Sequence, residues 1–151
     1  MSTARIHRIL VVANETSAGR TLHTTIRARA PDPGAVRVLL VAPALNSRLR
    51  HWLSDEDDAR RVAEERLRRS LDRLDEAEIR AEGVVGDADP LQAIDDALRG
   101  FRADEIVIAT HPEGRSNWLA RGFVERARRR YSQPIIHVIV DNAQGVERVA
   151  A

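Results

Sequence analysis

Two residue types that often carry chemistry are absent from this chain of 151 residues. It contains no cysteine, which excludes a disulfide framework and a zinc site built on thiolates. All 24 basic residues are arginine. Because lysine is absent, the chain has neither the lysine of a P-loop nor a lysine that forms a Schiff base.

Long apolar segments are also missing. No apolar run approaches the roughly 18 residues that a membrane span needs. The N-terminal residues lack the apolar core and the cleavage site of a signal peptide. A net charge of +1 gives no overall field that favours nucleic acid or an anionic membrane. We therefore expect a cytoplasmic protein that neither inserts into a membrane nor binds nucleic acid.

Short apolar runs alternate with amphipathic segments along the chain. The runs with strand character cover residues 6–13, 35–42, 79–85, 105–109 and 135–140. Strands that alternate with helices predict one α/β domain, an open, doubly wound, Rossmann-like parallel sheet of five strands with helices on both faces. We expect this domain to span residues 1–141, followed by a short polar C-terminal tail, residues 142–151.

Residues 103–141 organise the rest of the chain. They are predicted to form a strand, a polar loop from Thr110 to Ser116, a helix and the last strand, Ile135 to Val140. A crossover helix makes the two strands parallel. Ligands of open parallel sheets bind at the carboxyl ends of the strands, so the loop after the fourth strand is the first place to expect a site.

This stretch resembles the C-terminal segment of the universal stress protein family, which has the pattern G-x2-G-x9-G-[ST] between its last two strands. The four motif positions fall on Ala109, Pro112, Gly122 and Phe123, and only Gly122 keeps the family residue. The resemblance extends over almost the whole chain. It implies the strand order 3-2-1-4-5, a nucleotide site, and a homodimer that forms through the last strand, Ile135 to Val140.

The departures from the motif affect the phosphate contacts that the resemblance implies. The family carries a nucleotide-binding aspartate where this chain has Asn14. Pro112 has no amide hydrogen, Ala109 adds a Cβ, and Phe123 replaces a hydroxyl. Gly122 serves either phosphate approach or close packing of the helix. We therefore expect ATP or AMP to bind weakly or not at all, and the sequence identifies no firm cofactor.

The implied strand order brings together three predicted loops, Asn14 to Ser17, Pro43 to Ser54 and Thr110 to Ser116. Polar side chains are concentrated in these loops. The candidate ligand-binding residues are Asn14, Val41, Asn46, Arg48, His51, Trp52, Thr110, His111, Gly114, Arg115, Ser116, Asn117 and Gly122. Arginine binds phosphate or carboxylate in a bidentate way, and tryptophan offers a stacking face. The loops therefore predict a pocket for an anionic, nucleotide-like ligand. In the alternative interpretation, Arg48 and Arg50 pair with the acidic residues 55–58.

The function that fits these observations is a non-catalytic regulatory or ligand-sensing domain of universal stress protein type. One alternative is a protein-interaction module of the same fold, serving a transporter or another protein. Another is a nucleotide hydrolase. Two enzyme patterns are weak: Gly114 to Ser116 matches only part of a nucleophile elbow, and His51, His111 and Glu113 have no regular metal-ligand spacing. We predict no catalytic residue and no metal site.

Several charged or titratable residues have a structural explanation. His7, His23 and His137 lie within or beside regular elements, where structural roles are expected. The arginines at positions 128–130 fall in the last turn of a predicted helix, where positive charge complements the helix dipole.

Overall fold

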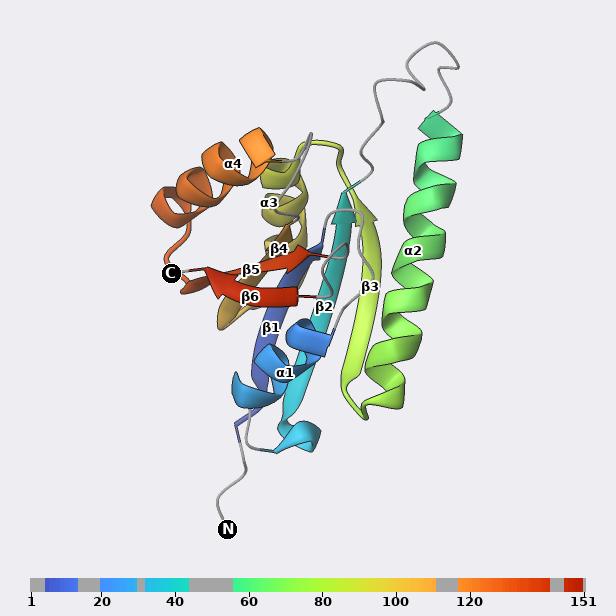
Figure 1. Cartoon of the computed structure of the whole chain (residues 1–151), viewed down its shortest axis with the longest axis vertical. Helices are drawn as coiled ribbons and strands as arrows, with labels where there is room; N and C mark the ends of the chain where they lie inside the picture. The colour runs from blue at the N-terminus through green and yellow to red at the C-terminus, as the bar shows by residue number, and fades with distance from the viewer. Residues whose placement is uncertain are drawn as a thin grey trace.

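The computed structural model describes residues 5–13, 20–29, 32–43, 56–110, 117–141 and 146–150 (Figure 1). The elements, in chain order, are β1 (His7–Ala13), α1 (Arg20–Arg29), the 3-10 turn η1 (Pro33–Ala35), β2 (Val36–Pro43), α2 (Glu56–Glu76), β3 (Arg80–Gly86), α3 (Pro90–Gly100), β4 (Glu105–Thr110), α4 (Asn117–Arg130), β5 (Ile135–Asp141) and β6 (Val146–Ala150). Within this part of the chain, every helix is too short or too polar to cross a bilayer.

The sheet confirms the predicted topology. Its strand order is β3-β2-β1-β4-β5-β6. The first five strands are parallel, and β6 is antiparallel to β5. The doubly wound parallel sheet with order 3-2-1-4-5 is therefore present, and β3 lies at one edge.

The C-terminal residues differ from the sequence prediction. The tail was expected to be short and polar, but Val146–Ala150 forms β6 and pairs with β5 from His137 to Asp141. β5 thus lies between β4 and β6 and is not the edge strand that the predicted dimer requires. An apolar edge strand is prone to unwanted pairing, and here the chain's own last strand covers it. A dimer that continued the sheet on this side would have to pair through β6.

Both faces of the sheet are covered by helices, so the central strand is buried on both sides. Ile9, Leu10 and Val11 are all 0% exposed, although neighbouring residues of a strand point to opposite faces. Ile9 belongs to the core under α1 and α2, together with Leu74. Leu10 belongs to the core under α3 and α4, together with Ile94. This double burial explains why β1 is apolar almost without interruption.

The first turn of α3 is fixed by its cap and by a close contact with the sheet. The side chain of Asp89 accepts a hydrogen bond of 3.0 Å from the backbone nitrogen of Leu91 and caps the helix. A Cβ at Gly86, the last residue of β3, would lie 2.8 Å from Cβ of Ala93. The absence of a side chain at Gly86 therefore allows α3 to approach the strand ends.

One buried carboxylate holds the amino end of β4. Glu105 is 7% exposed, and its two oxygens lie 2.7 Å from Nε2 of His7 and 3.1 Å from Nη1 of Arg29. These partners link β1 and α1 to β4. The contact gives His7 the structural position that was predicted for it.

Candidate functional site

The carboxyl ends of the central strands form the edge where the ligand site is predicted. β1 ends at Ala13, which pairs with Ala109, and β4 ends one residue later at Thr110. Thr110 pairs with Ile139, so β5, which ends at Asp141, runs two residues further. β5 therefore stands above β4 on one side of the junction between β1 and β4.

This junction is the point where the strand order reverses, because β2 follows β1 on one side and β4 lies on the other. The predicted loops begin at the ends of β1, β2 and β4. Most of the predicted site residues lie in those loops and outside the described residues, namely Asn14, Asn46, Arg48, His51, Trp52, His111, Gly114, Arg115 and Ser116. Their proximity to one another stays a prediction.

Thr110 is the predicted site residue whose contacts are best defined. It is 6% exposed, and its Oγ1 lies 2.6 Å from Nε2 of His137 on β5. The pair joins the last residue of β4 to the neighbouring strand on the face covered by α4. The Thr110 hydroxyl therefore ties the carboxyl end of β4 to β5.

His137 is a residue whose place at the site the sequence did not identify. Burial lowers the pKa of its imidazole, and the positive charge of Arg128 lowers it further. The ring is therefore neutral near neutral pH, with one nitrogen that donates and one that accepts. The alternation of β5 shows which face His137 occupies. Its pairing with Thr110 depends on the register between two strands and has no local sequence signal.

Val41 belongs to the core and is not an open ligand contact in the described structure. Its side chain is 0% exposed and packs with the residues under α3, including Ile94. A Cβ at Gly86 would come within 3.0 Å of its Cγ1. Val41 thus supports the strand end from which the second predicted loop departs.

Gly122 and Phe123 explain part of the lost motif. Gly122 is the sixth residue of α4 and is exposed, and no described residue lies within 4 Å of an added Cβ. Close packing is therefore not the reason for a glycine here. Only the first four amides of a helix are free, so the Gly122 amide is already used within the helix. Phe123 is 3% exposed and fills the core under α4, which accounts for a large apolar residue at this position.

The start of α4 is favourable for an anion. The helix begins at Asn117, directly after the predicted loop, and has no acidic residue in its first turn. The first amides of a helix have no partner within the helix, and the helix dipole adds positive character at this end. A phosphate or carboxylate near the end of β4 would be attracted to such a terminus.

The opposite end of α4 is anchored to α3. Arg130 donates through Nε to Oδ1 of Asp95 at 3.2 Å, and the Tyr131 hydroxyl lies 2.7 Å from the same oxygen. Partial burial acts to raise the pKa of Asp95, but the hydrogen bonds from Tyr131 and Arg130 more than offset it, and the pKa is lowered. Burial and the contact with Asp95 raise the pKa of Tyr131 above its usual range. Arg130 thus has a specific structural partner, in addition to the dipole role predicted for residues 128–130.

Metal coordination finds no support in the part of the chain that the structure describes. No group of three or more histidine, aspartate or glutamate side chains is arranged there to hold a metal ion. The weak metal and hydrolase patterns fall on His51 and on residues 111–116, outside the described residues.

Comparisons with known proteins show a likeness of fold. No protein-family model and no curated protein matches the chain. Among solved structures, a universal stress protein family protein from Arabidopsis thaliana, crystallised with AMP bound, is similar over 91% of this chain and 94% of its own. The TM-score is 0.57 at 12% sequence identity. At this identity the likeness concerns the arrangement of helices and strands, and the chain therefore has the fold of the universal stress proteins.

Proposed function

We propose that the chain is a non-catalytic regulatory or ligand-sensing domain that binds an anionic, nucleotide-like ligand at the carboxyl edge of its sheet. The observation that carries this proposal is the reversal of strand order between β1 and β4, because ligands of open α/β sheets bind at such a switch point. A cytoplasmic location and a role in a stress response are parts of the same proposal.

The chemistry around the switch point supports an anion. The first turn of α4 contains no acidic residue, and the amides of a first helical turn have no partner within the helix. Arg48 and Arg115 belong to the two loops that leave β2 and β4, on either side of β1. The Arabidopsis protein of the same fold was crystallised with AMP, which makes a mononucleotide the first ligand to test.

The departures from the family motif predict a preference against ATP. Ala109 lies within β4 and is 2% exposed, so its backbone is committed to the sheet. Phe123 is buried and offers no hydroxyl, and Pro112 offers no amide hydrogen. Three of the backbone or hydroxyl contacts expected for a triphosphate are therefore missing.

Calorimetric titration of AMP, ATP and inorganic phosphate tests the proposal. Arg48→Gln and Arg115→Gln should each weaken the tightest of these ligands about tenfold or more, since a hydrogen bond to a charged group contributes ~1.5–3 kcal/mol. Arg68→Gln, an exposed change on α2, removes the same charge away from the site and should have no effect. Binding of none of the three ligands, or equal weakening by all three variants, would refute the site.

Two further results would change the proposed role. Steady phosphate release from ATP, abolished by Arg115→Gln, would make the chain a nucleotide hydrolase. Homodimer formation stays a prediction, and light scattering on the full chain measures it.

A further inference from the structure

Three arginines form a row across the amino ends of β1, β2 and β3. Arg8 on β1 pairs in register with Arg37 on β2, and Arg37 pairs with Arg80 on β3. Strand alternation places all three on the face of the sheet that α3 partly covers, because Leu39 and Leu10, two residues further along, belong to the core under that helix. Neighbouring strands lie about 4.8 Å apart, so three positive charges stand side by side.

The arginine row, as we call Arg8, Arg37 and Arg80, is not neutralised by the described residues. None of the three side chains lies within 4.0 Å of a carboxylate in the part of the chain that the structure describes. The nearest acid in register, Asp104, is engaged by the backbone nitrogen of Arg8 at 2.9 Å and by Arg5 at 3.1 Å. Like charges that face each other on adjacent strands destabilise a sheet, so folding alone does not explain the row.

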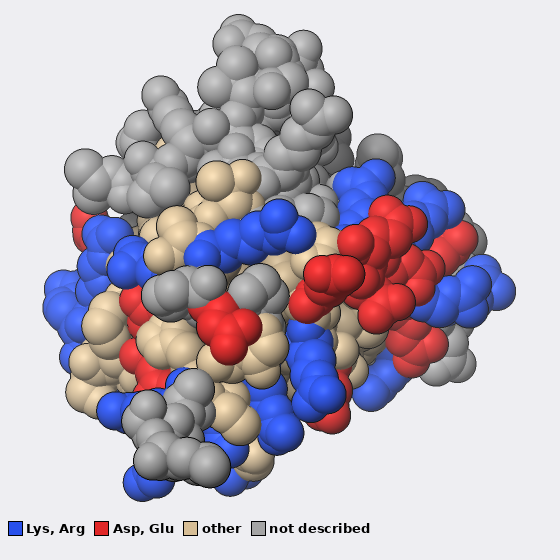
Figure 2. Space-filling model, turned by 90° about the horizontal axis from the view of Figure 1, so that it is seen from below, with Lys and Arg blue, Asp and Glu red and all other residues tan. Residues whose placement is uncertain are grey.

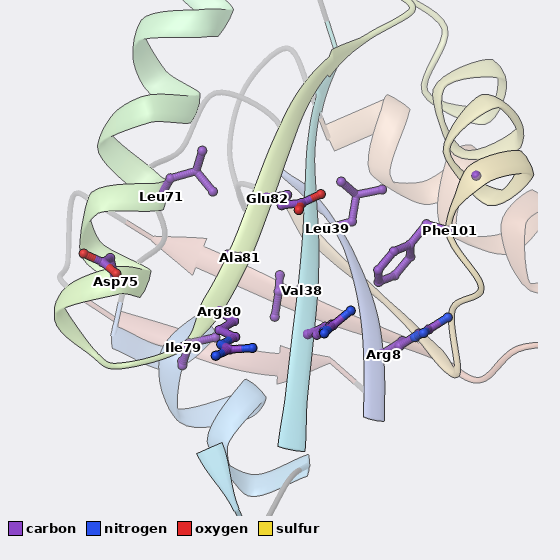
Figure 3. Close-up of a pocket in the computed structure, with 12 residues that line it drawn as sticks. Arg8, Val38, Leu39, Leu71, Asp75, Ile79, Arg80, Ala81, Glu82 and Phe101 are labelled. Atoms are coloured by element: carbon purple, nitrogen blue, oxygen red, sulfur yellow. The ribbon is translucent and has the colours of Figure 1, made fainter. Parts of the chain in front are cut away.

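A pocket lies over the arginine row. It has a volume of about 550 Å³, and its lining includes all three arginines together with Leu39, Phe101 and Glu82. Leu71 and the carboxylate Asp75 of α2 line it from the other side of β3. Figure 3 shows Leu39 and Phe101 side by side above Arg8, while Arg80 and Glu82 extend from β3 toward β2. Arg37 and Arg80 are exposed, and Figure 2 shows arginine side chains at the surface of this end of the molecule. The pocket thus combines an open cationic row with an apolar wall.

We propose that this pocket binds a small molecule that carries two or more linked phosphate groups. Guanidinium groups match phosphate oxygens in a bidentate way, and three of them in one row suit a chain of phosphates better than a single one. Leu39 and Phe101 offer a surface for an apolar or aromatic part of such a molecule. Glu82, the one pocket carboxylate on this face of β3, lies a pleat away from the row, level with Leu39, and disfavours an anion that extends in that direction.

The pocket is separate from the switch-point site. The row lies at the level of Arg8, near the start of β1, whereas the switch-point loops begin after Ala13. At about 3.3 Å per residue, the two places are separated by roughly 15–20 Å along the strands. The inference therefore does not depend on the function proposed above.

Inorganic tripolyphosphate, titrated calorimetrically against the whole chain, is the probe for this pocket. We expect one molecule to bind, and Arg37→Gln and Arg80→Gln should each weaken binding about tenfold or more. The matched control Arg68→Gln should leave affinity unchanged. Inorganic phosphate should bind much more weakly than tripolyphosphate.

Four outcomes would overturn the inference. The first is absence of tripolyphosphate binding, and the second is that Arg68→Gln weakens this binding as much as Arg37→Gln does. The third is that Arg115→Gln abolishes tripolyphosphate binding while Arg37→Gln retains it fully. The fourth is an affinity for single-stranded RNA that rises with RNA length and exceeds the affinity for tripolyphosphate. The third would assign the anion to the switch-point site and the fourth would assign the row to nucleic acid.

Thermal unfolding without ligand provides a second measurement. Removing the central charge relieves repulsion from both neighbours, so Arg37→Gln should raise the unfolding midpoint relative to wild type, whereas Arg68→Gln should not. A lower midpoint for Arg37→Gln would mean that the arginine stabilises the sheet, and the row would then need no ligand to explain it.

Discussion

Replacing Gly122 with alanine separates the two roles that a glycine at this motif position can have. Gly122 lies inside α4 and is exposed, and among the residues that the structure describes none comes within 4 Å of an added Cβ. Glycine within a helix is less favourable than alanine by about 0.5–1 kcal/mol. Gly122→Ala should therefore raise the free energy of unfolding by that amount, which corresponds to roughly 1–4 °C in the unfolding midpoint of a chain of this size.

Gly86→Ala is the matched control, because the same chemical change meets a different environment. Its new Cβ would lie 2.8 Å from Cβ of Ala93 and 3.0 Å from Cγ1 of Val41. Neither neighbour is a long flexible side chain, so α3 would have to move away from the strand ends. Overpacking of this kind lowers stability by about 1–3 kcal/mol. Urea unfolding of both variants should thus give changes of opposite sign.

The Gly122→Ala variant also tests the ligand role directly. Since the Gly122 amide lies beyond the four free amides of the helix, affinity for AMP or phosphate should match that of the wild type. A variant that stays folded but loses anion binding would refute this reasoning and would place Gly122 against the ligand. A loss of stability would instead show that the position tolerates no side chain.

Three further predictions concern described contacts. Tyr131→Phe removes a hydroxyl 2.7 Å from Asp95 and should lower the free energy of unfolding by about 1 kcal/mol. In the wild type, a pH titration followed by absorbance should show that the single tyrosine does not ionise near its ordinary pKa of 10.0. Ionisation at the ordinary pKa would contradict the contact with Asp95. The pKa of His137 is lowered in the folded chain, so the unfolded chain binds a proton on this imidazole more tightly. The contribution of the neutral imidazole to stability is therefore complete above pH 6.5 and is lost as the pH falls through the lowered pKa of the folded state. His137→Gln should flatten that part of the profile of urea unfolding against pH, and an unchanged profile would argue against this role of His137. Truncation after Asp141 removes β6 and exposes β5, so light scattering should detect a larger mass than for the full chain, and an unchanged mass would refute the covering role of β6.

The parallel sheet could be predicted because its signals are local. The apolar run of β1 and the cap at Asp89 each follow from a few adjacent residues. β6 has no such signal, since Val146–Ala150 is short and contains two charged residues. It exists because β5 offers an unpaired edge, and this condition arises only in the assembled fold.

The candidate site was predictable by position but not by contact. The sequence predicts a strand over residues 105–109 that is followed by a loop from Thr110; the strand is confirmed and includes Thr110 as its last residue. Its partner His137 lies on a different strand and meets it only through the β4–β5 register. The resemblance aligned Gly122 with a phosphate loop, whereas α4 begins five residues earlier, at Asn117. Helix boundaries and strand register, which no short motif encodes, therefore decide which predicted residues are free to meet a ligand.

The two sides of the sheet are protected against pairing with other chains in different ways, and this difference has a consequence for solubility. On one side, β6 is the edge strand and satisfies the backbone of the apolar β5 by hydrogen bonding, and this covering of β5 does not depend on salt. At the other edge, the exposed face of β3 presents Arg80, Glu82 and the apolar Val84, which is 43% exposed. Charge is the main protection there, and salt screens exposed charges. Self-association at high ionic strength should therefore begin at β3, and a polyphosphate that neutralised the arginine row would favour the same contact.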